Sequence, residues 1–389
     1  MLETQPDLSD KMIPFNKPYF SGKELEYMSL AIQNGRTSGN QEYSKKIDKF
    51  FCEQYGFKQA LFTTSCTDAL EMCSILLDIR PGDEVILPSY TFVSTANPFV
   101  MRGAKLVFAD SCSSQPNIDH SKLESLITSK TKAIIVVHYG GVACEMDTIV
   151  DLCKKHELYL VEDAAQAIDS FYKGKPLGSF GDLSTFSFHE TKNLSCGEGG
   201  LLAINNEEFT SRAEIIWEKG TNRSSFFRGE IDKYGWVDVG SSFLASDLLG
   251  GYLYAQIENL KDIQQKRISI WKKYYELLKS GEGKGWYSLP DIPSYATING
   301  HLFYLVCNSV DERGALISYL RERSIHAVFH YLSLHKSDFY EDKHDGRVLA
   351  NSDKFTHRLV RLPLFYELTE EQIEYICNTI CQFFESKND

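Results

Sequence analysis

The sequence predicts an α/β fold: a mainly parallel sheet covered by helices on both faces, followed by a smaller α+β unit. Two observations predict it. Short β-branched runs alternate with helical patterns through the first half of the chain, as they do in consecutive βαβ units. No Pro/Gly/Ser-rich linker and no run of like charges divides the 389 residues, which favours one large unit with an appendage.

The expected elements begin after a polar, acidic tail over residues 1–11, which we expect to be flexible or disordered. Two helical patterns come first, over residues 22–33 and 43–55. The alternation that follows predicts strands at 59–63, 84–88, 105–110, 133–138 and 158–162, and helices at 67–77, 92–101 and 146–156. Two further apolar runs, 183–188 and 200–204, lie on either side of a glycine-rich loop and suit strands near the active edge of the sheet.

The remaining pattern predicts the second unit. A further helix starts near Glu207, and a long helix-prone stretch over 245–277 connects to a strand and two helices at 301–308, 314–323 and 370–385. We therefore expect a large domain over residues 12–258 and a small C-terminal domain over residues 259–389.

Composition favours small-molecule chemistry. The formal charge, 41 − 53 = −12, disfavours nucleic acid and provides no basic patch for a membrane surface. The sequence has neither a signal-peptide pattern nor an apolar run long enough to span a bilayer, so we expect a cytoplasmic protein. The ten cysteines are scattered without CxxC or zinc-site spacing, which predicts reduced, mostly buried thiols and no metal site.

Ligands of open α/β sheets bind where the strands end, so the residues after each predicted strand are candidates. Residues 64–70 are small and polar and open a helix, whose N-terminus can bind a phosphate, with the Thr67 hydroxyl as a further donor. An ordinary helix cap is the commoner role of such a sequence.

Asp163 ends a buried strand, where a carboxylate needs a cation or hydrogen-bond donors beside it; it could keep a pyridine nitrogen protonated. A helix cap or a structural ion pair is the alternative.

Lys192 follows another predicted strand and precedes the glycines of residues 196–200. Its flexible arm suits imine formation once neighbours lower its pKa, although a single loop lysine is usually solvated surface. Ser187, five residues earlier, could supply a phosphate-binding hydroxyl. Phe92 follows the strand at 84–88 and could stack on a planar cofactor ring, although core packing is the commoner fate of a phenylalanine.

Taken together and in this order, these segments resemble the DegT/DnrJ/EryC1/StrS family of nucleotide-sugar aminotransferases, a branch of the fold-type I pyridoxal-phosphate (PLP) enzymes. The resemblance runs from Ile13 to the C-terminus. It rests on IPFNKP, PGDEVILPSYTFVSTANPFVMRGA, VHYGGVACEMD, VEDAAQA, FSFHETKN followed by GEGG, EKGTNRSSFFRGEIDKYGWVDVGSS, VFHYLSLH and RLPLF. It implies a fold-type I transferase, pyridoxal 5'-phosphate as cofactor, and a homodimer with active sites at the subunit interface.

The resemblance also implies roles for matching residues. Lys192 would hold the cofactor as a Schiff base and pass protons, Asp163 would face the pyridine nitrogen, and Gln166 would lie near the ring hydroxyl. The remaining contacts would be Cys66, Thr67 and Ser187 to the phosphate and Phe92 to the ring. Many members carry G-Y-N-Y-R, whose Asn reaches the phosphate of the other subunit; here Ser242, in GSSFL, stands at the Asn position.

Four residues are candidates for the substrate side. His330 matches a family position near the active-site mouth. His189, three residues before Lys192, lines the pocket or serves as a structural histidine. Arg223 and Arg228 could bind a diphosphate through bidentate hydrogen bonds, or could be ordinary surface arginines.

Within the family, GTNRSSFFRG and DVGSS look most like dTDP-4-oxo-6-deoxyglucose aminotransferases that act at carbon 4. The resemblance implies two half-reactions: L-glutamate leaves its amino group and departs as 2-oxoglutarate, and the dTDP-linked keto-sugar then takes that group up. The product would serve surface-glycan biosynthesis, such as the O-antigen of lipopolysaccharide. Three alternatives are amination at carbon 3, a PLP sugar dehydratase of the same fold, and a scaffold without activity. The presence of Lys192 disfavours the dehydratase, whose relatives carry His at that position, and disfavours the inactive scaffold.

Overall fold

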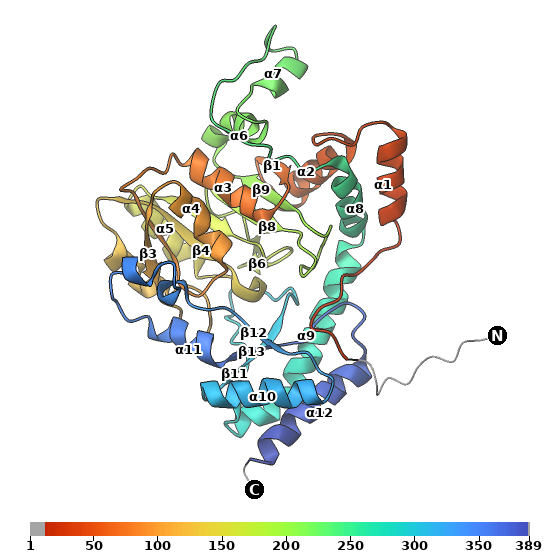
Figure 1. Ribbon diagram of the computed structural model, residues 1–389, viewed down its shortest axis with the longest axis vertical. Helices are drawn as coiled ribbons and strands as arrows, with labels where there is room; N and C mark the ends of the chain where they lie inside the picture. The colour runs from red at the N-terminus through yellow and green to blue at the C-terminus, as the bar shows by residue number, and fades with distance from the viewer. Residues whose placement is uncertain (1–11, 388–389) are drawn as a thin grey trace, which may run out of the picture.

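The computed structural model describes residues 12–387, so the tail predicted over residues 1–11 lies outside the described residues. Its largest element is a seven-stranded sheet (Figure 1). In spatial order the strands are β1 (Gln59–Thr63), β9 (Gly200–Ile204), β8 (Leu183–Ser187), β5 (Tyr159–Asp163), β4 (Thr131–Val137), β2 (Glu84–Pro88) and β3 (Lys105–Ala109). Strand β9 is antiparallel to both of its neighbours and the other pairs are parallel, which confirms the mainly parallel sheet.

Helices cover both faces of this sheet because its strands alternate apolar side chains between two cores. Ile134 of β4 packs in one core, and its neighbour Ile135 packs in the other. The helices of this part of the chain are α1 (Glu24–Gln33), α2 (Glu42–Tyr55), α3 (Cys66–Leu76), α4 (Asn97–Met101), α5 (Met146–Lys155), α6 (Thr210–Trp217), α7 (Arg223–Phe227) and α8 (Asp247–Glu258). Short 3-10 helices lie at Val93–Thr95, His120–Leu126, Tyr139–Gly141 and Glu207–Phe209, and a small hairpin joins β6 (Phe171–Tyr172) to β7 (Lys175–Pro176).

The second unit is built on a four-stranded antiparallel sheet. Its strands, in spatial order, are β10 (Tyr287–Ser288), β11 (Phe303–Cys307), β13 (Leu359–Leu362) and β12 (Val328–Phe329). Its helices are α9 (Leu260–Gly283), α10 (Val310–Glu322), α11 (Ala350–Arg358) and α12 (Glu370–Glu385), with 3-10 turns at Leu334–Lys336 and Glu341–Lys343. A separate apolar core lies within this unit. Ile13 joins that core and bridges to Ile325, just before β12, so the chain at Ile13 packs against the second unit.

Two predicted helices differ from the structure. The helix expected over 92–101 is a 3-10 turn followed by α4, because Pro98 lacks an N–H and starts a new helix better than it continues one. The stretch expected over 245–277 is two helices, α8 and α9, that meet at Asn259. We propose this junction as the boundary between the predicted domains 12–258 and 259–389.

Two further properties bear on the sequence predictions. All ten cysteines are free thiols, and six of them are buried. None of the described helices combines the length and the apolar character needed to cross a membrane.

Candidate active site

The carboxyl ends of neighbouring strands bring the predicted cofactor residues to one edge of the large sheet. Asp163 is the last residue of β5 and Ser187 is the last residue of the adjacent β8. Cys66 and Thr67 open helix α3, directly after β1. Parallel strands end at the same edge, so this gathering follows from the topology.

Asp163 is a buried carboxylate without a cationic partner. Its Oδ2 accepts a hydrogen bond from Thr95 Oγ1 at 2.7 Å, and its Oδ1 accepts from the backbone N–H of Ala165 at 3.2 Å. No Lys, Arg or His nitrogen of the described residues lies within 4.0 Å of it. Burial raises the pKa of the Asp163 carboxyl, while the bond from Thr95 and the charge of Lys192 oppose that shift. The site therefore favours a cationic group beside Asp163.

The neighbouring carboxylate, Glu162, differs because strand alternation sends it to the other face. Its oxygens accept hydrogen bonds from backbone N–H groups in the loop 178–181 at 2.7–2.8 Å, and His138 Nε2 lies 3.0 Å away. Burial raises the pKa of Glu162, but the bond to His138 and the backbone bonds outweigh it, so the pKa lies below its ordinary value. Glu162 is thus a fully bonded structural group.

Lys192 lies in the loop between β8 and β9, and this loop is anchored on both sides. The Lys192 backbone N–H donates to the carbonyl of His189 at 2.9 Å. The next residue, Asn193, is buried and donates to Gln264 Oε1 at 2.7 Å and to the carbonyl of Asn299 at 2.8 Å. These contacts fix the backbone around Lys192 although it belongs to a glycine-rich loop.

The electrostatic surroundings of Lys192 suit a reactive amine. Burial lowers the pKa of its ammonium group, with Arg361 adding to the effect, whereas Cys66 and Asp163 oppose it. A lowered pKa increases the fraction of neutral amine, which is the form that attacks a carbonyl carbon.

The start of helix α3 offers free donors. Ser65 caps the helix by accepting from the Asp68 N–H, and no described residue accepts from the backbone N–H groups of Cys66 or Thr67. Thr67 Oγ1 donates to Ser94 at 2.8 Å. Free N–H groups at a helix N-terminus are a phosphate-binding arrangement.

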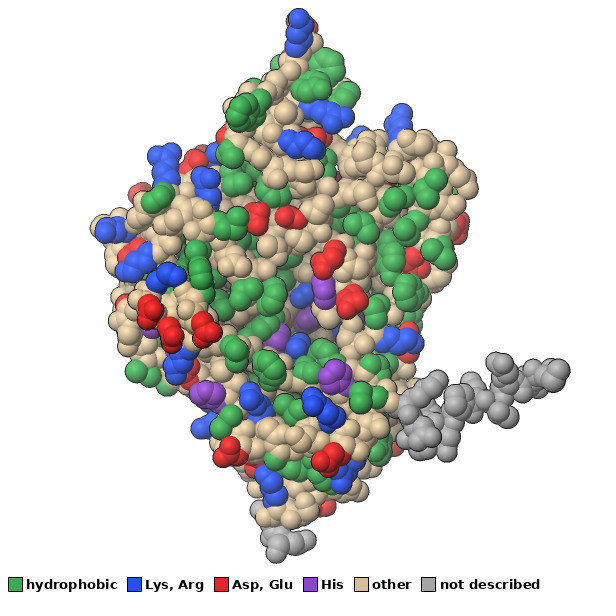
Figure 2. Space-filling model, in the orientation of Figure 1, with side chains coloured by type: hydrophobic (Ala, Val, Ile, Leu, Met, Phe, Trp, Pro, Cys, Tyr) green, Lys and Arg blue, Asp and Glu red, His purple; other side chains and the backbone are tan. Residues whose placement is uncertain are grey.

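A cavity of about 60 Å³ lies beside Lys192. Gln166 contributes from the large sheet, while His330, Tyr331 and Arg361 contribute from the second unit. Gln166 donates to the Tyr331 hydroxyl at 3.1 Å, and His330 Nδ1 lies 2.9 Å from the Tyr139 hydroxyl. Figure 2 shows histidine and basic side chains gathered near the centre of this face, between the two units.

Two other predicted residues lie near this region without lining the cavity. Phe92 is 54 % exposed, and its ring centroid lies 6.0 Å from that of Tyr331, so its side chain is accessible to a ligand. His189 has its Nδ1 2.9 Å from Thr191 Oγ1 and its Nε2 3.7 Å from Glu198.

The remaining predicted residues lie in a different cleft. Ser242, Arg223 and Arg228 line an open cavity of about 870 Å³ beside helix α7. Arg228 already pairs with Glu214 at 2.8 Å and Glu230 at 2.7 Å. Within one chain, the structure therefore does not bring these three residues to Lys192.

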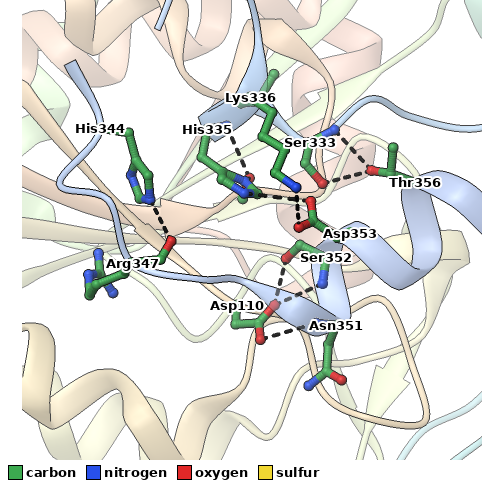
Figure 3. Close-up of polar contacts among 12 residues, drawn as sticks. Asp110, Ser333, His335, Lys336, His344, Arg347, Asn351, Ser352, Asp353 and Thr356 are labelled. Carbon is green, nitrogen blue, oxygen red and sulfur yellow. Dashed lines mark hydrogen bonds and ion pairs between the residues drawn. The ribbon is translucent and has the colours of Figure 1, made fainter. Parts of the chain in front are cut away.

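A buried polar cluster fastens the second unit to the large sheet next to the site (Figure 3). Asp110, just after β3, accepts hydrogen bonds from the backbone N–H and the hydroxyl of Ser352 in α11, at 2.8 and 2.9 Å. His335 Nδ1 lies 2.7 Å from the hydroxyl of Ser89, the residue after β2. These bonds fix the segment that follows His330 against the loop that carries Phe92.

Four residues of the site were not assigned a role from the sequence: Thr95, His301, Tyr331 and Arg361. Thr95 belongs to the predicted helix 92–101 that is broken, so its bond to Asp163 depends on that break. His301 Nδ1 lies 3.0 Å from Asn193 Oδ1, a contact over more than 100 residues that no local pattern indicates. For Arg361 there was a signal, because a charged residue interrupts an otherwise apolar strand, VRLPLF.

No metal site was predicted. One group of described residues has ligand atoms within 4.8 Å of one another: Cys112, Asp119 and His120. The Asp119 carboxylate already accepts from Ser121 and pairs with Lys122 at 3.1 Å.

The residues present fit pyridoxal phosphate. The unpaired, buried Asp163 suits a protonated pyridine nitrogen, and the free N–H groups of Cys66 and Thr67 suit a phosphate. Lys192 supplies an amine of lowered pKa between them.

Comparison with known proteins agrees with this geometry. Residues 19–381 match the model of the DegT/DnrJ/EryC1/StrS aminotransferase family. GDP-perosamine synthase of Escherichia coli O157:H7 is 30 % identical over 97 % of this chain and 100 % of its own. The aminotransferase TlmJ from Streptoalloteichus hindustanus superposes with a TM-score of 0.89 at 26 % identity, covering 97 % of this chain and 100 % of its own. Spr1654 from Streptococcus pneumoniae in its PLP-form gives 0.87 at 25 % identity, covering 96 % and 99 %. The chain belongs to the DegT/DnrJ/EryC1/StrS aminotransferase family of fold-type I, pyridoxal-phosphate-dependent sugar aminotransferases.

Proposed function

We propose that this enzyme transfers the amino group of L-glutamate to carbon 4 of dTDP-4-oxo-6-deoxyglucose. The product is a dTDP-4-amino-4,6-dideoxyhexose for a surface glycan such as an O-antigen. The segments GTNRSSFFRG and DVGSS support this choice of substrate within the family. The predicted cytoplasmic location is part of the same proposal.

One observation carries the aminotransferase chemistry: a lysine of lowered pKa lies beside a small cavity and close to a buried carboxylate that has no cationic partner among the described residues. When bound, pyridoxal phosphate supplies an electrophilic carbon and an electron-accepting ring. Asp163 stabilises positive charge at the ring nitrogen through its own negative charge. Lys192 Nζ takes the proton from the α-carbon of the donor and returns a proton to the sugar carbon in the second half-reaction.

We also propose that the active sites are completed in a homodimer. Residues 220–240 form an arm that projects from the large unit around α7 (Figure 1). Two of its aromatic side chains, Phe227 and Trp236, are 68 % and 84 % exposed. Apolar exposure of this kind suits a protein partner, and a second copy would bring the cleft of Ser242 next to another Lys192.

The experiment supplies the purified protein and pyridoxal phosphate with L-glutamate and dTDP-4-oxo-6-deoxyglucose. We expect 2-oxoglutarate in equal amount to an amino sugar whose proton couplings, measured by NMR, locate the nitrogen at carbon 4. A parallel reaction uses the GDP-linked 4-oxo sugar, because one relative is named for a GDP-linked product. Light-scattering measurement of the molar mass tests the dimer.

Three results would contradict the proposal. Nitrogen at carbon 3 of a dTDP-3-oxo-6-deoxyhexose would favour the first alternative. Loss of a hydroxyl without 2-oxoglutarate would favour the dehydratase. Faster turnover of the GDP-linked sugar than of the dTDP-linked sugar would identify GDP as the nucleotide of the substrate.

A further inference from the structure

His335 links the second unit to the segment that follows β2. Its Nδ1 lies 2.7 Å from the hydroxyl of Ser89, and its backbone N–H donates to the same oxygen at 3.3 Å. The backbone N–H of Leu334 donates to the carbonyl of Ser89 at 2.9 Å. Three hydrogen bonds therefore join two stretches of chain that lie 246 positions apart in the sequence.

The imidazole ring of His335 is also held from its other side. Its Nε2 lies 3.6 Å from Asp353 Oδ1, an oxygen that is buried and has no hydrogen-bond partner among the described residues (Figure 3). Burial lowers the pKa of His335, which favours the neutral ring. With its proton on Nε2, facing the Asp353 carboxylate, the ring accepts a hydrogen bond from the Ser89 hydroxyl through Nδ1.

Serine, histidine and aspartate in this order also activate the nucleophile of hydrolases. Here the geometry indicates a different role, because Ser89 is fully buried and its hydroxyl proton is used in the bond to His335. Neither residue lines the cavity beside Lys192. The bond between them therefore acts on the position of the chain.

The segment that begins at Ser89 ends at the candidate cofactor site. Thr95 Oγ1 donates to Asp163 Oδ2 at 2.7 Å, and Thr91 Oγ1 lies 2.8 Å from Thr95 Oγ1. Since Thr95 has a single hydroxyl proton, Thr91 is the donor of the second bond. Phe92 lies between these two threonines. The segment is thus fastened by the second unit at one end and by Asp163 at the other.

Other contacts between the two units are made at a different place. The Tyr340 hydroxyl accepts from the backbone N–H of Leu106, in the edge strand β3, at 2.7 Å. Ser352 donates to Asp110, just after the same strand. Tyr340 therefore provides a comparison with His335, because its buried bond joins the same two units away from the Ser89 segment.

We propose that His335 is a positioning residue for the cofactor: through Ser89 it holds Phe92 and Thr95 in the arrangement that binds pyridoxal phosphate. This inference rests on the roles proposed for Phe92 and Asp163 at the cofactor ring. It also makes cofactor binding depend on the docking of the second unit, because the strap that holds Thr95 against Asp163 is itself held by that unit.

The test compares His335→Leu and His335→Asn with Tyr340→Phe in the full-length enzyme. The dissociation constant of pyridoxal phosphate is measured by equilibrium dialysis. Loss of one buried hydrogen bond that positions the site predicts binding weakened by roughly 10-fold in His335→Leu. Asn keeps a hydrogen-bonding group near the place of Nδ1, so His335→Asn should recover to within about threefold of the parent. Tyr340→Phe should stay within about twofold, since its lost bond does not hold the site.

Hydrogen exchange of the backbone amides adds a measurement that does not depend on activity. Peptides that cover residues 89–95 should exchange faster in His335→Leu and at the parent rate in Tyr340→Phe. Both variants lose a buried bond, so both should lower the melting temperature. A purely structural role of His335 would lower the melting temperature without changing cofactor affinity.

Two results would overturn the inference. The first is parent-like cofactor affinity and exchange of residues 89–95 in a folded His335→Leu enzyme. The second is an equal loss of cofactor affinity in Tyr340→Phe, because any contact between the units would then suffice. Failure of the proposed sugar specificity is distinguishable from both: no dTDP-linked sugar is aminated, while cofactor binding still depends on His335. A wrong role for Asp163 would show separately, as parent-like turnover in Asp163→Asn.

Discussion

The cavity beside Lys192 and the cleft beside the arm differ in how their charged groups are satisfied. The first is small, and Arg361 in its wall pairs with no carboxylate of the described residues. Asp163, whose carboxyl group is within the electrostatic influence of Lys192, pairs with no cation of the described residues. The second is large and open, and its Arg228 already makes two ion pairs with carboxylates of the same chain.

The difference teaches what each region lacks. Unpaired buried charges destabilise a fold unless a ligand compensates them, so the first region is built for small charged molecules. In the second region Arg228 is paired within the chain, and the nearby arm exposes the aromatic side chains of Phe227 and Trp236, which suits a protein partner. Our predictions follow this contrast, beginning with the largest expected effect.

Replacing Lys192 by Ala should have the largest effect. It removes both the amine that binds the cofactor carbon and the group that moves protons, so we expect turnover to fall by at least about 10³-fold. The visible absorbance of the lysine-bound cofactor should vanish as well. Steady-state kinetics with glutamate and an absorbance spectrum measure the two effects. Glutamate turnover at the parent rate would show that another residue is the catalytic base.

The adjacent carboxylates Asp163 and Glu162 provide a matched pair. Asp163→Asn removes a fixed negative charge from the reaction, so turnover should fall by roughly 10²-fold. The melting temperature should hold, because burial disfavours the Asp163 charge in the fold. Glu162→Gln should instead cost about 1–3 kcal/mol of folding free energy, since it disturbs several buried hydrogen bonds. Calorimetric melting and kinetics separate these outcomes. Lost turnover in Glu162→Gln together with lost stability in Asp163→Asn would make Glu162 the functional carboxylate and Asp163 the structural one.

The sequence predicts most of the large sheet but only part of the candidate site. Local patterns were enough for most strands, and for β1, β2 and β9 the predicted limits agree with the structure. The pattern could not place residues whose role depends on distant contacts. Arg361 lines the same cavity as Lys192, and it does so because β13 pairs with β11 in the second sheet. Short strands such as β12 have too few residues to leave a periodic signal, and they form because β13 provides a partner.

The pH dependence of stability tests how well His330, in the wall of the Lys192 cavity, is shielded from water. Burial, followed by the charges of Arg361 and Lys192, lowers the pKa of His330 well below its ordinary value. The unfolded chain therefore binds more protons than the folded chain below about pH 6.5, so stability should fall as pH falls. His330→Asn should reduce that slope by up to about 1.4 kcal/mol per pH unit. Denaturant titrations between pH 7.5 and 5.5 measure it, and identical slopes would mean that water reaches His330.

The smallest effect on stability is expected for the arm. Arg228 is about half exposed, with a side-chain exposure of 47 %, so its ion pairs are screened by solvent and Arg228→Met should change the folding free energy by less than about 1 kcal/mol. If the arm meets the substrate diphosphate across a dimer interface, the same variant should raise the KM for the nucleotide sugar and leave that for glutamate unchanged. Lys233→Met is the control, because it removes one positive charge from the same arm. Equal KM values for the nucleotide sugar in the two variants would mean that the arm contacts only the other subunit. The Lys192 cavity would then bind the small molecules, and the cleft beside the arm would bind the protein partner.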